Sequence, residues 1–112
     1  MTSAQWLRVA AAADVVEDAP LGIVVAGREI ALFRVAGEIF ATDNRCTHGD
    51  ALLSEGFQLD DCIECPLHQG QFDIRTGAPL CAPVERPIRT WPAKVEADAV
   101  FVDLAGPGSA GT

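Results

Sequence analysis

Two short Cys–His pairs constrain this chain more than any other feature. The first reads Cys-Thr-His at residues 46–48, and the second, after sixteen intervening residues, reads Cys-Pro-Leu-His at residues 65–68. The chain has only two histidines, and both lie in these pairs. Thiolate and imidazole are the side chains that bind zinc, copper and iron. Two such pairs on two separate turns can present four ligands to one metal centre: Cys46, His48, Cys65 and His68.

The size and charge of the chain narrow the classes of function. A length of 112 residues is typical of one domain. The formal net charge is −8, from 16 acidic and 8 basic residues, which argues against nucleic acid or anionic lipid as a partner. This charge favours a partner with a basic docking surface, although acidity for solubility alone explains it equally well.

The chain shows no feature of membrane insertion or export. No apolar run approaches the roughly twenty residues of a membrane span, and the first residues lack a basic and apolar signal segment. We therefore expect a cytoplasmic protein without a membrane partner. In that reducing location four cysteines are ligands or free thiols rather than disulfides.

Short strands separated by tight turns dominate the rest of the sequence. Residues 29–35 alternate, with Ile30 and Leu32 on one face and Ala31 and Phe33 on the other. Further strands are expected over residues 4–9, 21–26, 39–41, 62–64 and 71–74, and a hairpin over residues 88–97 and 100–104. No long helix or repeat is visible. The pattern predicts a small all-β sandwich or barrel that carries the ligand pairs on loops.

Several residues outside the pairs have expected structural roles. Residues 78–87 contain three prolines, which predicts a stiff loop. Cys62 and Cys81 are expected to be small buried apolar side chains rather than ligands. The expected core of the all-β base includes Trp6, Leu7, Val9, Trp91, Val95, Val100 and Val102.

The order of the ligands separates two kinds of metal centre. Zinc fingers and ribbons pair Cys with Cys and His with His, whereas each pair here mixes one Cys with one His. A mixed pair suits a centre in which two thiolates bind one metal and two imidazoles bind another, as in Rieske [2Fe–2S] centres. Structural zinc stays open as the alternative.

The motif C-T-H-x16-C-P-L-H-Q-G-x-F resembles the Rieske motif. Residues 6–104 are similar to the Rieske-type ferredoxins of bacterial aromatic-ring-hydroxylating dioxygenases of the naphthalene dioxygenase type. The resemblance implies the Rieske fold, an antiparallel sandwich-like base with an inserted smaller cluster-binding subdomain. It implies a single domain over residues 1–104, with the subdomain at about 45–84, and a flexible tail over residues 105–112.

The same resemblance implies a role for each ligand. Cys46 and Cys65 would bind the inner iron of one [2Fe–2S] cluster, and His48 and His68 the outer iron. Residues that would cover the cluster or form a docking rim around it are Leu52, Leu67, Gln69 and Pro83.

Four departures from the cytochrome bc-type Rieske proteins indicate a ferredoxin. Those proteins have two further cysteines where this chain has Asp50 and Leu67, so the disulfide between their cluster loops is missing. Their Ser and Tyr hydroxyls, which donate to sulfur, are replaced by Gly70 and Phe72. Fewer hydrogen bonds to sulfur destabilise the reduced cluster, so we expect a potential at the low end of the Rieske range.

The resemblance implies a one-electron carrier with no catalytic site of its own. It would pass electrons from a flavin-containing NAD(P)H reductase to the terminal oxygenase of an aromatic-ring dioxygenase, as a monomer that meets each partner transiently. A monooxygenase or a nitrite reductase is an alternative partner. A zinc-stabilised interaction module and an iron–sulfur redox sensor are alternatives of other classes.

Overall fold

The computed structural model describes residues 6–47, 50–67, 70–81 and 86–105, which form three antiparallel sheets and two short 3-10 turns. The first sheet contains β1 (Trp6–Ala11), β11 (Ala99–Asp103) and β10 (Ala93–Glu96) in that order. The second contains β2 (Leu21–Val25), β3 (Arg28–Val35), β4 (Glu38–Asp43) and β9 (Thr90–Trp91). The third contains β5 (Phe57–Leu59), β6 (Cys62–Glu64), β7 (Gln71–Asp73) and β8 (Pro79–Cys81). The 3-10 turns are η1 (Ala12–Asp14) and η2 (Leu53–Glu55).

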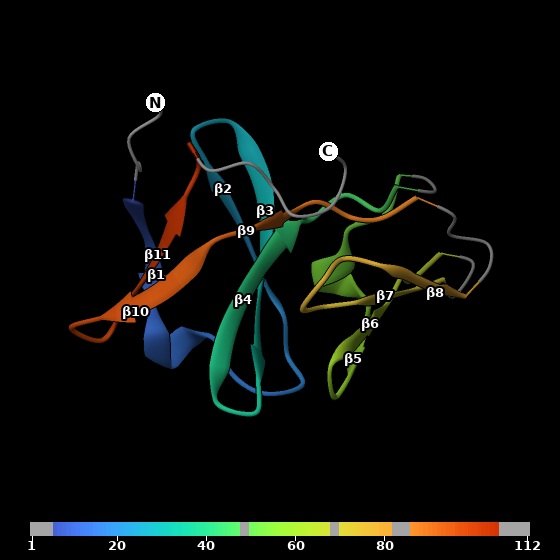
Figure 1. Ribbon diagram of the computed structural model, residues 1–112, viewed down its shortest axis with the longest axis horizontal. Coiled ribbons are helices and arrows are strands. Elements are labelled where there is room, and N and C mark those ends of the chain that lie inside the picture. Colours follow the sequence, from blue (N-terminus) through green and yellow to red (C-terminus); the bar gives the residue numbers. More distant parts are fainter. Residues whose placement is uncertain (1–5, 48–49, 68–69, 82–85, 106–112) are drawn as a thin grey trace.

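The second sheet lies between the other two and contributes to both cores (Figure 1). Successive side chains of a strand point to opposite faces. On β3, Ile30 and Leu32 pack toward the first sheet, and Ala31 and Phe33 pack toward the third. The alternation predicted for this strand is confirmed, and both of its faces are buried.

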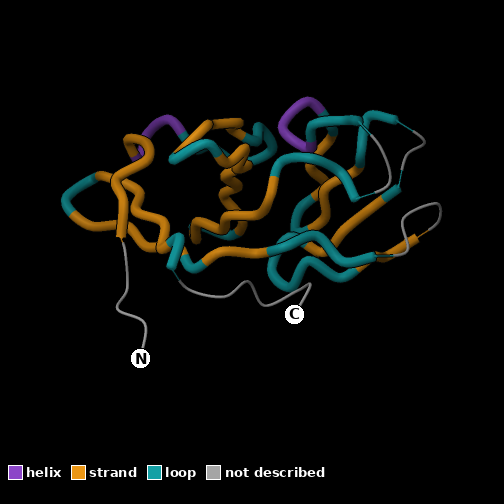
Figure 2. Tube along the Cα trace, turned by 90° about the horizontal axis from the view of Figure 1, so that it is seen from above, coloured by secondary structure: helices purple, strands orange, loops and turns teal. Residues whose placement is uncertain are grey.

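Each core has its own set of partners. The core toward the first sheet includes Val15, Ala41, Trp91, Val100 and Val102, and it makes the first and second sheets a sandwich-like base. The core toward the third sheet includes Leu53, Ile63, Phe72, Ile74 and Ile88, together with Cys46 and Cys65. Figure 2 shows the third sheet and its connecting loops as a separate body beside this base.

The predicted all-β fold is confirmed, and so are the strand at Cys62–Glu64 and the hairpin of β10 and β11. No helix in the described part of the chain is long and apolar enough to cross a membrane. The division at about residues 45–84 stays a prediction. The predicted tail falls outside the described residues from residue 106 on.

Two expectations for the base were wrong. Trp6 and Leu7 are 36% and 38% exposed, because they begin the edge strand β1, and the ammonium of Lys94 lies 4.4 Å from the Trp6 ring centroid. Val95 is 46% exposed, whereas Val100 and Val102 are buried as predicted.

Two expectations around the third sheet were also wrong. Pro79 begins strand β8 instead of belonging to an irregular loop, since β8 is an edge strand, where a missing N–H is tolerated. Cys81 is exposed and Cys62 is half-buried, because both lie on the outer face of this sheet.

Gly56 is required where η2 approaches β6. A Cβ atom there would overlap the carbonyl oxygen of Glu64 and lie 3.2 Å from that of Leu53. We expect Gly56→Ala to lower the free energy of unfolding by about 3 kcal/mol, because backbone must move to relieve the overlap. The control is Gly37→Ala, where φ is +83° and no atom lies within 4 Å. This control should cost about 1 kcal/mol of conformational strain. Urea unfolding followed by tryptophan fluorescence measures both, and equal losses would contradict the steric argument.

Candidate metal centre

The two Cys–His pairs lie on loops that are closed in the same way. The backbone N–H of Cys46 donates to the carbonyl of Ala51 at 2.8 Å, and that of Cys65 donates to the carbonyl of Gly70 at 2.7 Å. Each cysteine therefore begins a loop that closes five residues later. His48 and His68 belong to these loops in sequence but lie outside the described residues. The fold thus brings together two loops with the same order of Cys and His.

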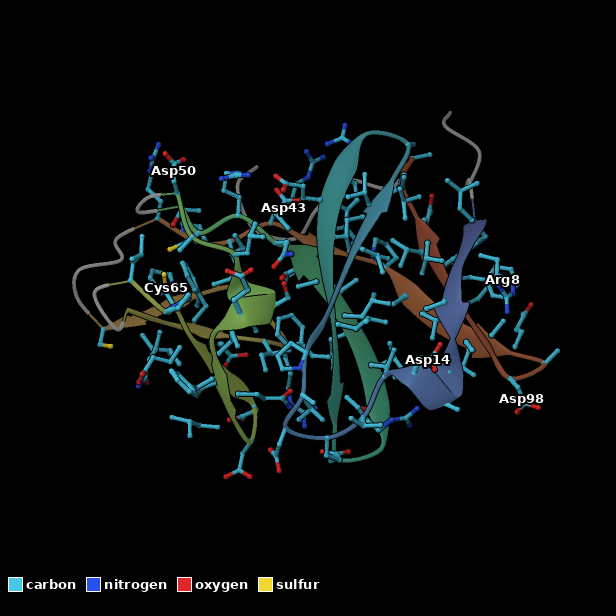
Figure 3. All side chains as sticks on the ribbon, turned by 180° about the vertical axis from the view of Figure 1, so that it is seen from behind. Arg8, Asp14, Asp43, Asp50, Cys65 and Asp98 are labelled. Atoms are coloured by element: carbon cyan, nitrogen blue, oxygen red, sulfur yellow. The ribbon has the colours of Figure 1, made fainter. Side chains whose placement is uncertain are left out.

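The two thiols meet inside the core toward the third sheet. Cys46 is 4% exposed and Cys65 is 1% exposed, and their side chains hydrogen-bond each other. Burial and then the hydrogen bond with Cys46 raise the pKa of the Cys65 thiol to about 11, although the Leu67 backbone N–H acts to lower it. Figure 3 shows Cys65 inside this end of the molecule.

The surroundings of the Cys46 and Cys65 thiols fit a metal cation bound between them. Two buried thiolates in contact repel each other and lack water, so ionisation requires a positive charge between them. Iron in an iron–sulfur cluster supplies such a charge and is bound by thiolates. No group of three or more metal-ligating side chains occurs among the described residues, which leave out both histidines. The donor set present therefore fits the thiolate half of a mixed-ligand cluster.

Asn44 fixes the base of the first loop. It is buried, its backbone N–H donates to the carbonyl of Glu29 at 3.0 Å, and its own carbonyl accepts from the N–H of Leu53 at 2.7 Å. Its side-chain amide donates to Ser54 Oγ at 2.9 Å and accepts from the Ser54 N–H at 2.8 Å. These bonds join the end of β4 to η2, so Cys46 follows a rigid position.

The third sheet fixes the second loop. Cys65 directly follows β6 and Gly70 directly precedes β7, so this loop is the connection of the β6–β7 hairpin. Ile63 and Phe72 pair across the hairpin and are both fully buried. A register slip would move them to the outer face, so this pair sets the position of Cys65.

A third segment reaches the first loop from residues 86–88. Thr47 Oγ donates to the carbonyl of Arg86 at 2.9 Å, and the guanidinium of Arg86 donates to the carbonyl of Thr47 at 3.3 Å. The backbone N–H of Ile88 donates to Gly77 at 2.8 Å. These contacts hold the end of the proline-rich segment against the first loop, whereas Pro83 lies outside the described residues.

Two of the four residues predicted for the docking rim lie among the described residues. Leu67 is 45% exposed on the second loop, and Leu52 is half-buried and forms a β-bridge with Arg45 on the first. Gln69 and Pro83 fall outside the described residues. Sequence reasoning did not find Asn44, Thr47 or Arg86 as supports of the loops, because nothing in the sequence places Ser54 or residue 86 beside them.

Cys62 and Cys81 lie apart from this centre and from each other. Cys62 is opposite Asp73 and Cys81 is opposite Gln71, with β7 between them. Two strand spacings are about 10 Å, beyond the roughly 7 Å that a disulfide spans between Cα atoms. Burial and then the carboxylate of Asp61 raise the pKa of Cys62, which leaves it a protonated thiol. Neither Cys62 nor Cys81 forms a disulfide.

Comparison with known proteins identifies the centre. The family model of the Rieske [2Fe-2S] domain matches residues 5–92. The ferredoxin component of the naphthalene 1,2-dioxygenase system of Pseudomonas putida is 50% identical over 101 residues, which cover 90% of this chain and 97% of the relative.

Two solved structures agree. The Sphingomonas yanoikuyae B1 ferredoxin matches with a TM-score of 0.85 and 41% identity, over 88% of this chain and 98% of its own. A chain from the complex of reduced oxygenase and oxidized ferredoxin in carbazole 1,9a-dioxygenase matches with a TM-score of 0.82 and 37% identity, over 88% and 92%. The centre is thus a Rieske-type [2Fe–2S] cluster rather than a zinc site. The chain belongs to the Rieske [2Fe-2S] family, in the branch of the ferredoxins of aromatic-ring dioxygenase systems.

Proposed function

We propose that this chain carries single electrons from a flavin-containing NAD(P)H reductase to the terminal oxygenase of a multicomponent aromatic-ring dioxygenase. The observation that carries the proposal is the 50% identity, over 90% of the chain, to a naphthalene dioxygenase ferredoxin component. The cluster, when bound, supplies a centre that accepts one electron and gives it up again. The chain is an electron carrier and not an enzyme.

The proposed ligands are Cys46, His48, Cys65 and His68. The paired burial of the two thiols and the matching closure of the two loops support this set. The backbone and Asn44 contacts fix both loops, so the ligands keep their positions when the charge of the centre changes. The histidines are proposed from their places in the motif.

The proposed docking surface is a rim of Leu52, Leu67, Gln69 and Pro83, and the 45% exposure of Leu67 supports it. A carrier that must leave each partner suits a monomer with small, transient interfaces. We also propose a cytoplasmic location, because four cysteines without a disulfide suit a reducing compartment.

Cysteine and histidine variants test the ligand set. Cys46→Ser and His68→Ala should lose the cluster or change its visible spectrum, since each removes a metal ligand. Cys62→Ser and Cys81→Ser are matched controls on the outer face of the third sheet and should retain it. Iron and sulfide analysis together with visible absorption measures the result. Full cluster content in Cys46→Ser, or its loss in both controls, would contradict the assignment.

The reduction potential tests the surroundings of the cluster. The position of Phe72 carries a buried apolar ring, and Gly70 contributes only its backbone carbonyl to the closure of the second loop. Neither supplies a side-chain hydroxyl to sulfur. We expect a midpoint of roughly −150 mV, at the low end of the Rieske range. Redox titration followed by circular dichroism measures it, and a clearly positive value would refute the argument.

Reconstitution tests the function. The purified, cluster-loaded chain is combined with NAD(P)H and the reductase and oxygenase of the naphthalene 1,2-dioxygenase system. Product formation should depend on the concentration of this chain and should be absent with cluster-free Cys46→Ser as the control. A fully loaded chain that neither accepts electrons from the reductase nor supports product formation would refute the proposal.

A further inference from the structure

Four arginines from distant parts of the sequence form one continuous edge beside the first loop: Arg28, Arg45, Arg86 and Arg89, here termed the arginine edge. The guanidinium of Arg89 lies 4.2 Å and that of Arg28 lies 5.0 Å from the centroid of the Trp91 ring. Arg28 and Arg45 line one shallow recess at the β2–β3 turn. Arg86 contacts Thr47, two residues beyond Arg45. The edge therefore runs from Trp91 to the first loop.

This edge is positive although the protein is acidic. Among the described residues, no carboxylate forms an ion pair with Arg28, Arg86 or Arg89. Arg45 alone is paired, with Glu29 at 2.9 Å and Asp50 at 3.5 Å. The edge also carries the carboxylates of Glu29, Asp43 and Asp50, so its four arginines leave it a small net positive charge in a chain with 16 acidic and 8 basic residues.

The network around Trp91 holds two of these cations in place. Trp91 is buried, and its indole N–H donates to Asp43 Oδ1 at 2.9 Å. The backbone N–H of Asp43 also donates to the carbonyl of Arg89 at 2.8 Å. A cation over a fixed aromatic face loses less conformational freedom on docking than a free side chain. Arg28 and Arg89 are thus preorganised for a partner.

The third sheet has the opposite sign. Its strands and turns carry Asp60, Asp61, Glu64 and Asp73 against the one cation Arg75. Asp43 and Asp50, labelled in Figure 3, lie within the arginine edge, whereas Arg8 lies outside it, on the far side of the molecule from Cys65. The arginine edge thus lies beside the first loop, whereas the carboxylates of the third sheet, apart from Glu64, lie at the end of that sheet away from the second loop.

We propose that the arginine edge docks on an acidic patch of the reductase next to its flavin, an inference that rests on the proposed function. Two ligand thiolates and an oxidised [2Fe–2S] core have formal charges of −2 and +2, so the oxidised carrier keeps the chain's −8 and the reduced one has −9. An electron added beside the arginine edge weakens its attraction to an acidic patch. Such a partner binds the oxidised carrier more tightly and releases the reduced one, as an electron donor must.

Charge reversal at matched positions tests this proposal. Arg28→Glu and Arg86→Glu are compared with Arg8→Glu, because each variant changes the net charge equally, from −8 to −10. We expect Arg28→Glu and Arg86→Glu to weaken binding of the oxidised carrier to the reductase about fivefold to tenfold at low salt, and less at high salt. Arg8→Glu should stay within about twofold. Calorimetric titration measures affinity, and stopped-flow absorption measures reduction by the reductase.

Equal affinities for the reductase in all three variants would overturn the proposal, and so would a loss confined to the oxygenase. Visible spectra and midpoint potentials verify that each variant keeps its cluster. If Arg86→Glu loses it through the contact with Thr47, Arg28→Glu decides the outcome. Failure of the proposed function is distinguishable, because the unmodified chain itself would then not exchange electrons with the two partners.

Discussion

The contact between two buried thiols is the constraint on which the rest of this structure depends. Cys46 and Cys65 belong to different loops, yet both are almost inaccessible to water and they hydrogen-bond each other. Thiolates in such a place are unfavourable without a cation, so binding of the cluster and stability of this core are coupled. The backbone hydrogen bonds from Cys46 to Ala51 and from Cys65 to Gly70 close the two loops around this contact.

A two-faced strand makes that arrangement possible in a small protein. One face of β3 packs on the first sheet and the other on the third, so a single strand stabilises both the base and the support of the metal centre. Phe33 belongs to the same buried cluster as both thiols. Movement of the third sheet would expose this core. The centre is therefore held by packing from below and by backbone hydrogen bonds within the loops.

Local signals predicted the features that depend on local chemistry. The Cys–His spacing predicted the cluster, the alternation in residues 29–35 predicted the buried strand, and the runs at residues 88–97 and 100–104 predicted the last hairpin. Features that depend on tertiary position were wrong or missed. Trp6 and Cys81 have apolar or small side chains, but edge strands and outer faces leave them exposed. The bonds between Asn44 and Ser54 join residues ten apart and have no sequence pattern.

The sequence also gives the net charge but not how the charges are distributed over the surface. A value of −8 predicts basic partners, but the fold collects cations from residues 28, 45, 86 and 89 on one edge and carboxylates on the third sheet. A carrier has two encounters, and its charge changes by one between them. If the carrier were uniformly acidic, basic patches on both partners would bind its reduced form more tightly. Tighter binding of the reduced form suits the electron acceptor but slows release from the electron donor. The arginine edge, as the proposed contact with the reductase, removes that conflict at the donor, since the added electron then weakens this docking contact.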